Sequence, residues 1–561
     1  MRRNPIPLAL LAALMLLLAA CSSGSSGGAD GDNMESAATD SADDADDADE
    51  FSGETEQEPT SQERTLVVAA SGTPSGFDGD IFGPNMQPVV VNLNEPLVDY
   101  GVGEAQDDGA RQIDTATIEG RLATAWEESE DGLTWTLELR DDVVSHRGNT
   151  FSSADVVWSY EKSKAQERTG NFIANFANVD TVEAIDEHTV QFNLSAPSPA
   201  FLDALTLYVP GIYDSTAAME HATDEDPYAT EWLAQNDAYF GPYFVESNAV
   251  DQQTVFAAHA DYYRGAPYFE RIIWQAVPEA ENRSTLMSTD QADWMRDAPI
   301  DQVVALQDRE GVRIQSVTSN EMARALMNPG FAPWDDVRVR QALNLAVDHQ
   351  RLLDVVFQGY GEIARGPVPP VEACATDEFW SYDQDVERAR ELLAEAGYPD
   401  GVDAELLYSD VRAWEEALAI QIADSASDAG FNITLQRIPS DEMTSRAAIS
   451  VRDLPFFTFY QNPILLDPGY TMFLDGASEG VSNRSDWSNA EYDALVIEAN
   501  QTLDPDARCD LLTQAQEIHM ADAPWLYGVW QDTVKVMGDD IDGWVWHGDQ
   551  HARWYDLERS S

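Results

Sequence analysis

The sequence predicts an α/β protein with more than one domain. The chain has 561 residues, which is long for one hydrophobic core, so two or three domains are expected. Between residues 386 and 438 two amphipathic helices alternate with two strands, which is typical of a sheet covered by helices. A hydrophobic content of 43%, with 15 Trp, 19 Tyr and 20 Phe, supports a globular body.

The first 21 residues have the pattern of an export signal. Arg2 and Arg3 provide a positive start, and the apolar run from Leu8 to Ala20 is too short to span a bilayer comfortably. The run ends on Leu18-Ala19-Ala20-Cys21 before a Ser/Gly tract, which resembles a bacterial lipobox. We therefore predict a lipoprotein signal peptide and lipobox over 1–21, with Cys21 as the lipidated N-terminus.

Residues 22–64 are predicted to be a disordered acidic tether. Ser, Gly, Ala, Asp and Glu dominate this segment, and it has almost no apolar residues from which a core could form. The acidic run from Asp43 to Glu50 lacks the glycine and the ligand spacing of an EF-hand calcium loop. We interpret that run as a solvated spacer.

The first globular part is predicted to be rich in strands. Thr65–Ala70 is a buried strand, and Ser71-Gly72-Thr73-Pro74 forms the turn after it. A hairpin is expected within 122–143, with a helix after it that Ser152 or Ser153 caps. A second hairpin is expected over 180–194.

The stretch from Asn328 to Gly361 is predicted to be a helical hairpin in a core. Asp335 or Asp336 can cap its first helix, and Asp348 can cap its second. Gly359 suits the left-handed position that ends a helix. The apolar candidates for burial are Val339, Leu343, Ala346 and Val347 in the first helix and Leu352, Leu353, Val355, Val356 and Phe357 in the second.

Helices and strands alternate in the rest of the chain. They are expected as a helix over 386–401 ending at Gly397, the strand AELLYSD, a helix over 414–429 ending at Gly430, the strand FNITLQRI, helices over 489–499 and 504–520, and a strand from Pro524 that returns to the first domain.

The charge excludes a nucleic-acid binder of the usual basic kind. The formal net charge is −69, from 32 Lys and Arg against 101 Asp and Glu. Residues 30–63 hold 14 of the acids, so 87 remain in the body from residue 65 onward, against 29 basic residues there. An acidic body with only three lysines is typical of a halophilic protein, because molar salt shortens the screening length to roughly 3 Å.

Motifs for chemistry are scarce, and we predict no catalytic residue, no cofactor and no metal site. The sequence has no His-Glu-x-x-His motif, and Gly101-Val102-Gly103 lacks the third glycine of a dinucleotide-binding loop. His547 and His551 are separated by a Gly-Asp break, which argues against the helical spacing of a metal site. Cys374 and Cys509 can form a disulfide outside the cell, but their pairing stays open at this level.

Three segments in order resemble family 5 of the extracellular solute-binding proteins, the peptide, nickel and oligosaccharide receptors of ABC importers. They are LATAWEESEDGLTWTLELRDDV at 122–143, FSSADVVWSY after it, and PWDDVRVRQALNLAVD within the central hairpin. The resemblance runs from about Thr65 to the C-terminus. It implies a fold like the type II periplasmic binding proteins, with two lobes and an extra subdomain, the cluster C architecture.

The resemblance also implies the domain plan and the function. The expected domains are lobe I at 65–115, 236–325 and 528–561, the extra subdomain at 116–235, and lobe II at 326–527, which closes over a ligand by hinge motion. The chain would be a monomeric, non-enzymatic receptor subunit on the outer face of the cytoplasmic membrane, or in a periplasm if an outer membrane exists, with ABC permease subunits as partners.

Ligand-binding residues are predicted from the segments that line the cleft in relatives. They are Ser71, Gly72, Trp414, Phe459, Tyr460, Asn462, Asp467 and Tyr527. FFTFYQNPILLDPGYTMFL at 456–474 resembles the segment in which peptide receptors carry an Asp for the α-amino group; Asn462 stands nearest that position, and Asp467 can substitute for it. An oligopeptide is the expected ligand, and a neutral solute such as an oligosaccharide is the alternative.

Two other functions stay open at this level. One is a secreted hydrolase that uses a pair of carboxylates, and the other is a sensor that hands its ligand to a signalling receptor.

The anchor gives the first prediction. Cys21→Ser removes the only sulfur that the lipid can modify in the lipobox, so the variant should be shed into the medium or stay an uncleaved precursor. Membrane fractionation and immunoblotting measure this. A processed Cys21→Ser protein that still sediments with membranes contradicts the lipid assignment.

The charge gives the second prediction. The melting temperature should rise from low to molar NaCl, because salt screens the repulsion among the 87 body carboxylates. Thermal melts over a NaCl series measure the effect, with an uncharged osmolyte as the control. A melting temperature that does not respond to NaCl removes the halophile interpretation.

Overall fold

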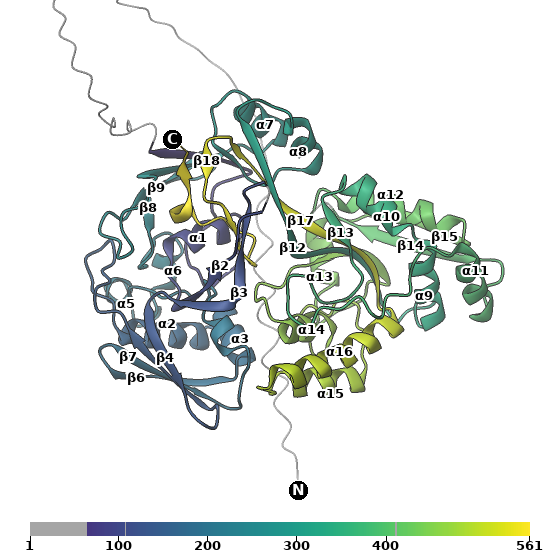
Figure 1. Cartoon of the computed structure of the whole chain (residues 1–561), viewed down its shortest axis with the longest axis horizontal. Helices are drawn as coiled ribbons and strands as arrows, with labels where there is room; N and C mark the ends of the chain where they lie inside the picture. The colour runs from purple at the N-terminus through teal and green to yellow at the C-terminus, as the bar shows by residue number, and fades with distance from the viewer. Residues whose placement is uncertain (1–63, 107, 410–411, 561) are drawn as a thin grey trace, which may run out of the picture.

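The computed structural model describes residues 64–106, 108–409 and 412–560, which form two lobes side by side (Figure 1). We assign lobe I to 64–120, 236–311 and 539–560, an extra subdomain to 121–235, and lobe II to 328–524. The predicted signal peptide, Cys21 and almost all of the tether lie outside the described residues. Within the described ranges, no helix combines the length and the apolar character needed to cross a membrane.

One mixed sheet of 11 strands runs through both lobes, so the predicted α/β fold with two lobes and an extra subdomain is confirmed. Its order from lobe II to lobe I is β15 (Phe431–Arg437), β14 (Val402–Tyr408), β16 (Phe456–Gln461), β12 (Val312–Met327), β17 (Trp525–Gly538), β11 (Trp294–Met295), β1 (Thr65–Ala70), β10 (Arg271–Ala276), β9 (Gln253–Ala258) and β8 (Tyr243–Ala249), with β13 (Gly361–Ile363) beside β17.

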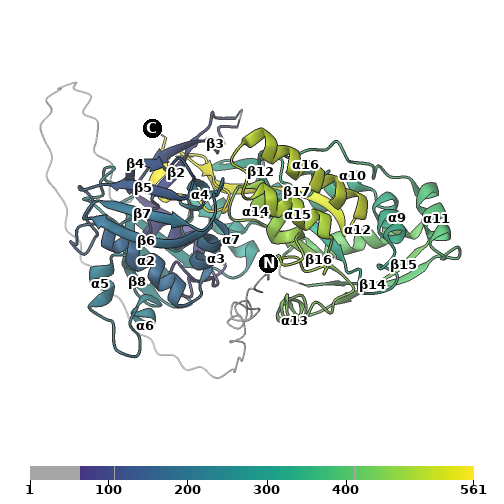
Figure 2. The ribbon, with the colours of Figure 1, turned by 90° about the horizontal axis from the view of Figure 1, so that it is seen from below.

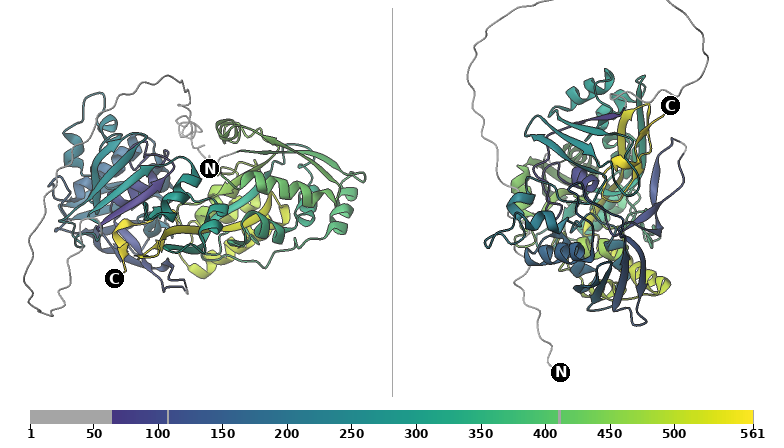
Figure 3. Two further views of the ribbon diagram at one scale, coloured as in Figure 1. Left: turned by 90° about the horizontal axis from the view of Figure 1, so that it is seen from above. Right: turned by 90° about the vertical axis from the view of Figure 1, so that its left-hand side faces the viewer.

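The antiparallel strands β12 and β17 carry the chain from one lobe to the other (Figures 1 and 3). Val312 to Thr318 pair with the lobe I end of β17, and Glu321 to Leu326 pair with its lobe II end. The register shifts between Thr318 and Glu321, so the ladder is interrupted where the lobes meet. The predicted lobe boundaries at 325/326 and 527/528 fall within these two strands.

The extra subdomain is a four-stranded antiparallel sheet packed against two helices (Figure 2). Both predicted hairpins form here, and Ser152 makes a reciprocal capping box with Asp155. The predicted boundary at 115/116 falls within β3, which pairs with β2. The elements are β4 (Ala123–Glu128), β5 (Thr134–Leu139), α2 (Ser153–Ala165), α3 (Thr169–Phe176), β6 (Val179–Asp186), β7 (Thr189–Leu194), α4 (Phe201–Ala204), α5 (Ser215–Met219) and α6 (Thr230–Leu233).

Short helices and small sheets complete lobe I, where the last described residues of the chain return (Figure 1). They are α1 (Gln87–Leu93), β2 (Val98–Val102), β3 (Arg111–Gly120), α7 (Ala280–Ser288), α8 (Ile300–Leu306), β18 (Ile541–Asp542), β19 (Val545–Trp546), the 3₁₀ turn η2 (Trp554–Asp556) and β20 (Glu558–Arg559).

Lobe II places helices around its part of the sheet, close to the predicted positions. They are α9 (Val337–Ala346), α10 (His349–Arg351), the π-helix η1 (Leu352–Val356), α11 (Val386–Glu395), α12 (Glu415–Ser427), α13 (Ser440–Arg446), α14 (Pro468–Gly476), α15 (Ala490–Ala499) and α16 (Pro505–Asp522). Asp336 caps α9 and Asp348 caps α10 through side-chain bonds to backbone N–H groups, as predicted.

The second helix of the central hairpin differs from the prediction in its winding. Residues 352–356 form a π-helix, whose wider turn places Leu352, Val356 and Phe357 together against the core of lobe II. Val355 faces solvent with half of its surface exposed, so its predicted burial is wrong. Gly359 ends the segment at φ +87°, the left-handed conformation expected for it.

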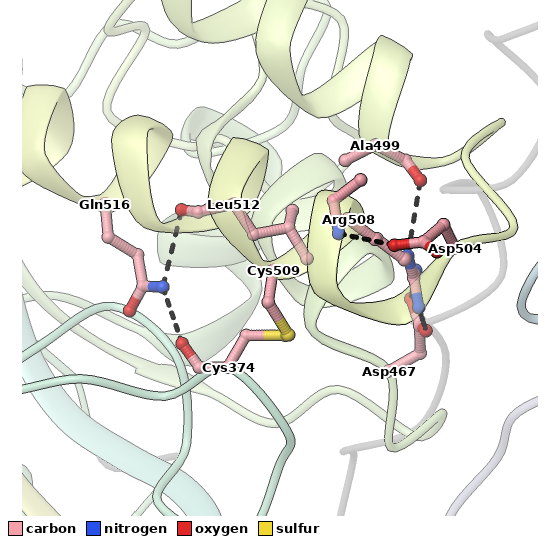
Figure 4. The surroundings of a disulfide bond; sticks show 9 residues. Cys374, Asp467, Ala499, Asp504, Arg508, Cys509, Leu512 and Gln516 are labelled. Carbon is pink, nitrogen blue, oxygen red and sulfur yellow. Dashed lines mark hydrogen bonds and ion pairs between the residues drawn. A yellow bond between two sulfur atoms is a disulfide. The ribbon is translucent and has the colours of Figure 1, made fainter.

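A disulfide joins two distant segments of lobe II (Figure 4). Cys374, in the loop after β13, bonds to Cys509 in α16, and their Cα atoms are 5.2 Å apart. The side-chain amide of Gln516, about two helical turns after Cys509 in α16, also donates to the Cys374 carbonyl at 2.9 Å. The pairing that the sequence left open is therefore made in the structure, and it ties the loop to the helix.

A buried ionic cluster connects the start of lobe I to the extra subdomain. Lys162 Nζ on α2 donates to both carboxylate oxygens of Asp78 at 2.9 and 3.0 Å. Asp80 accepts the Gly170 N–H at the start of α3 at 2.7 Å. Burial raises the pKa of Asp80 to about 7, against the opposing charge of Lys162 and with the help of Asp78. A protonated Asp80 leaves one carboxylate for one ammonium, so the cluster is neutral.

The Asp80 pKa predicts a specific loss of stability with pH. Because the folded pKa is raised from 3.8 to about 7, the folded protein holds this proton more tightly than the unfolded chain. This contribution to the free energy of unfolding is fully present below the unfolded pKa of 3.8. It is lost as the pH rises from there to the folded pKa of about 7, at roughly 1 kcal/mol per pH unit.

Asp80→Asn stays neutral at every pH, so its melting temperature should fall less than that of the wild type between pH 5 and pH 8. Thermal melts at fixed NaCl measure this, and Asp308→Asn at an exposed position is the control. Equal pH dependence in wild type and Asp80→Asn contradicts the assignment of the proton to Asp80.

Candidate functional site

A cavity of about 730 Å³ lies between the lobes, where β12 and β17 cross. Lobe I and the crossing strands contribute Arg296, Asp297, Glu321, Lys535, Asp549 and His551, the extra subdomain contributes Arg168, Asn171 and Phe172, and lobe II contributes Arg412, Phe459, Tyr460, Asn462, Asp475 and Arg484. A depression of similar volume on the outside of lobe II is lined only by that lobe. The cavity between the lobes is the candidate site, because hinge motion would change it.

Helix α3 bounds the cavity on the side of the extra subdomain. It faces α14 of lobe II in two views (Figures 1 and 2). The rings of Phe172 and Phe176 on α3 pack edge-on against Tyr470 on α14, with centroids 6.5 and 5.0 Å apart. The extra subdomain is therefore part of the wall of the site.

The lobe II wall carries two stacked aromatic rings at the end of β16. The Phe459 and Tyr460 rings are nearly parallel, with centroids 5.1 Å apart. The Arg412 guanidinium lies over Tyr460 at 4.3 Å, and that of Arg484 lies over Phe459 at 4.6 Å. Both rings were predicted as ligand contacts, and the structure places both in the cavity wall. Each ring also orients a cation.

Glu321 supplies a carboxylate beside the predicted Asn462. The Asn462 side-chain amide donates to Glu321 at 3.5 Å, the Gln531 amide also donates to it, and Arg412 makes an ion pair with it at 3.5 Å. Only 9% of Glu321 is exposed. β12 brings it there because Met322 pairs with Gln461 on β16, one residue before Asn462. The acid that Asn462 lacks is thus provided by the neighbouring strand.

Asp467 does not reach the cavity. It is buried as the N-cap of α14, where it accepts the Tyr470 N–H at 2.7 Å. Arg508 of α16 also makes an ion pair with it at 2.7 Å (Figure 4). Both roles hold its carboxylate within lobe II, so the structure gives no support for Asp467 as a substitute ammonium anchor.

The other predicted contact residues lie outside the cavity lining. Trp414 packs on Phe357 in the core of lobe II, with centroids 6.1 Å apart. Tyr527 is fully buried, and its hydroxyl donates to the His519 carbonyl at 3.1 Å. Gly72 accepts a bond from Trp274 Nε1 at 2.8 Å through its carbonyl, and Ser71 is exposed at the turn after β1.

Most acids that line the cavity already have a cationic partner. Asp475 pairs with Arg324 at 2.6 Å, Asp549 with Arg553 at 2.7 Å and Asp297 with Arg296 at 3.4 Å. The exposed Glu167 is the acid of this lining without an ion pair among the described residues.

Two bases that line the cavity have lowered pKa values. Burial and the nearby Arg296 lower the pKa of Lys535 to about 8, so it is mostly charged at neutral pH. Burial also lowers the pKa of His551 to about 3, despite the nearby Asp549, so this ring is neutral. The charges that a ligand meets therefore come from arginine, lysine and carboxylate side chains.

Chemistry at this cavity finds little support in the residues present. In the part of the chain that the structure describes, no group of three or more His, Cys, Asp or Glu could hold a metal ion. Gly476 to Gly480 has the Gly-x-Ser-x-Gly spacing of a nucleophile elbow, a pattern that sequence reasoning overlooked. Here it follows helix α14 instead of a strand, and the Ser478 hydroxyl donates to Asp493 at 2.6 Å. The geometry is that of a structural loop.

Comparison with known proteins decides the family. Residues 117–483 match the bacterial extracellular solute-binding proteins, family 5, middle region. That match covers more than half of the chain. This chain belongs to family 5 of the solute-binding proteins.

Individual relatives of this family-5 chain cover nearly its whole length. Heme-binding protein A of Haemophilus influenzae is 26% identical over 490 residues, which cover 83% of this chain and 87% of that protein. The probable D,D-dipeptide-binding protein DdpA of Escherichia coli strain K12 is 28% identical over 494 residues, covering 86% and 91%.

A solved structure shows the same fold. The binding protein DppA of Helicobacter pylori, in complex with the peptide STSA, has a TM-score of 0.74 and 21% identity, covering 89% of this chain and 98% of that one. The expected architecture of a type II periplasmic binding protein is therefore confirmed for this family-5 protein.

The family-5 site also contains residues that sequence reasoning missed. They are Glu321, Arg412, Arg484, Arg168 and Lys535. Glu321 and Lys535 lie in strands for whose side chains no ligand contact was predicted, and the three arginines lie in loops or at helix ends. The scarcity of basic residues was the one signal that could have pointed to them. The chain has only 32 Lys and Arg in 561 residues, and five of these line one cavity.

Proposed function

We propose that this family-5 protein is the receptor subunit of an ABC importer and captures an oligopeptide in the cavity between its lobes. The observation that carries the proposal is the pair of Glu321 and Arg412 beside stacked aromatic rings, at the point where the two lobes join. A zwitterionic peptide needs a carboxylate for its ammonium group and a cation for its carboxylate, and this wall provides both.

The hinge supports the same proposal. The register shift between Thr318 and Glu321 interrupts the ladder between the lobes, and Glu321 itself follows that interruption. Bending at this point moves lobe II relative to Lys535 and Arg296 on the other wall. Closure around a ligand would bury it and would present the closed form to permease subunits.

The remaining parts of the proposal concern the location of the protein. The protein would be a monomer anchored through the lipid on Cys21 at the outer face of the cytoplasmic membrane. The lipobox carries this proposal, and residues 22–64 would span the gap between the membrane and the body.

A neutral ligand such as an oligosaccharide is the second candidate. Phe459 and Tyr460 offer a face on which a sugar ring can stack. The number of charged groups around the rings favours the peptide, because a neutral ligand satisfies neither Glu321 nor the arginines after water is expelled. A hydrolase is disfavoured, since family members are binding proteins and the Ser478 loop lacks the geometry of a nucleophile elbow.

Titration calorimetry with a mixture of short peptides and with an oligosaccharide panel tests this function. Glu321→Gln should weaken peptide binding by about tenfold or more, because the peptide ammonium loses its carboxylate in a cavity that excludes water. Glu362→Gln, on the neighbouring strand β13 but exposed, is the matched control. Tight peptide binding that Glu321→Gln leaves unchanged overturns the anchor, and binding of sugars alone overturns the peptide assignment.

A further inference from the structure

Three cations in the cavity have no carboxylate partner. Arg168, Arg484 and Lys535 all line it, and none of them makes an ion pair within the described residues. They come from three different parts of the wall, which are the start of α3 in the extra subdomain, the loop after α14 in lobe II, and β17.

Arg484 is the most constrained of the three. Its guanidinium lies over the Phe459 ring at 4.6 Å, and one terminal nitrogen donates to the Ala447 carbonyl at 3.4 Å. Its buried Nε has no hydrogen-bond partner. The planar group is held in place by a ring and one weak bond, with donor capacity left toward the cavity.

Arg168 lines the cavity from the extra subdomain, whereas Arg484 lines it from lobe II. It precedes the first residue of α3, and its buried Nε also has no hydrogen-bond partner. The helix that follows is held by the bond from Gly170 N–H to Asp80 and by the contact of Phe176 with Tyr470. Arg168 therefore extends from a supported element, and its Nε has no partner among the residues that the structure describes.

Carboxylates within the cavity lie near these cations, with Asp475 acting on Arg484 and Asp297 and Asp549 on Lys535, but they form their ion pairs with other residues. Asp475, Asp549, Asp297 and Glu321 are each engaged by another arginine, at distances between 2.6 and 3.5 Å. Glu167 is exposed, next to Arg168 in the chain. The lining has five cations and five acids, and Arg324 and Arg553 behind it pair with Asp475 and Asp549, so these described groups together carry two more positive than negative charges, inside a protein whose formal net charge is −69.

Closure makes this excess costly unless the ligand is negative. Bringing the lobes together would remove water from Arg168 and Arg484, and burying a charge without a partner is strongly unfavourable. A neutral sugar leaves that cost in place. A zwitterionic peptide with neutral side chains has one ammonium group and one carboxylate. Its ammonium group can replace Arg412 as the partner of Glu321, and its carboxylate can then pair with Arg412. Such a peptide leaves Arg168 and Arg484 without a partner.

We propose that the natural ligand is a net anion with at least two carboxylates, bound by Arg484 on lobe II and Arg168 on the extra subdomain. This rests on the proposed binding function of the cavity and names the charge class of its ligand. Carboxylates match the guanidinium fork, and each can accept two parallel N–H bonds. Mutual repulsion of the two arginines disfavours closure of the empty cavity, and a dianion between them removes it.

Two sources of this chemistry fit the cavity. One is a short peptide with acidic side chains, and the other is a small organic di- or tricarboxylic acid without an amino group. The two share carboxylate recognition by Arg168 and Arg484 and differ only in the use of Glu321, which an ammonium group would engage.

Titration calorimetry separates these cases at an NaCl concentration that keeps the protein folded. The probes are tripeptides of equal size with Glu, Gln or Lys side chains, together with citrate, glutarate and a neutral trisaccharide. The proteins are wild type, Arg168→Gln, Arg484→Gln, Arg484→Lys and the exposed control Arg111→Gln on β3, each checked by thermal melting.

The Glu tripeptides should bind wild type at least about tenfold more tightly than the Gln tripeptides, and the Lys tripeptides should bind least. Arg168→Gln and Arg484→Gln should each remove most of this preference and leave affinity for Gln tripeptides nearly unchanged. Arg484→Lys should restore part of it, since charge returns without the fork, whereas a purely structural role of Arg484 predicts equal losses for all probes. Arg111→Gln should match wild type.

The outcomes distinguish this inference from the proposed function. Equal binding of Glu, Gln and Lys tripeptides, or a preference that survives both Arg→Gln changes, overturns the anionic ligand and leaves the peptide receptor in place. Binding of citrate or glutarate without any tripeptide supports the anionic ligand and overturns the peptide assignment. Binding of the trisaccharide alone overturns both.

Discussion

The pairing of β12 with β17 is the constraint on which the rest of the structure depends. These two strands are the crossings between the lobes in the described chain, and they belong to one sheet that continues into both lobes. A ladder of this length would make the lobes one rigid body. The register shifts between Thr318 and Glu321 and again between Ala323 and Ala325, and the first of these interruptions lies next to the cavity, where the proposed hinge would bend. Glu321 and Lys535 reach the cavity because they lie on these strands.

Charge is distributed in opposite ways on the outside and in the cavity. The body carries a large excess of carboxylates, whose repulsion salt can screen because they face solvent. Inside the cavity almost every carboxylate is matched with arginine, and arginines remain. Screening acts weakly on groups that are partly buried, so the proposed binding of an anion in the cavity would persist at salt concentrations that screen the charges of the surface. Selection of the ligand and solubility in salt thus depend on different residues.

Local patterns predicted the elements well and the site only in part. Ser152, Asp336 and Asp348 cap helices as expected, because a cap is decided by side chains within three residues of the helix start. Asp467 was predicted as a possible ligand anchor, and the same short-range rule makes it the cap of α14. Phe459 and Tyr460 were found from the resemblance of their segment to relatives. Glu321 was missed because its place beside Asn462 depends on strand pairing across 141 residues of sequence.

By itself the sequence determined the order of strands and helices, the family resemblance, the acidic surface and the predicted export signal. All of these follow from periodicity, caps and composition, which act within a few residues or over the chain as a whole. Only the tertiary structure decided which charges meet. Arg168, Arg484 and Lys535 lie far apart in the chain and resemble ordinary surface cations in sequence. Their lack of ion-pair partners becomes visible only when three parts of the fold enclose one cavity, because the cost of an unpaired charge depends on which groups surround it after folding.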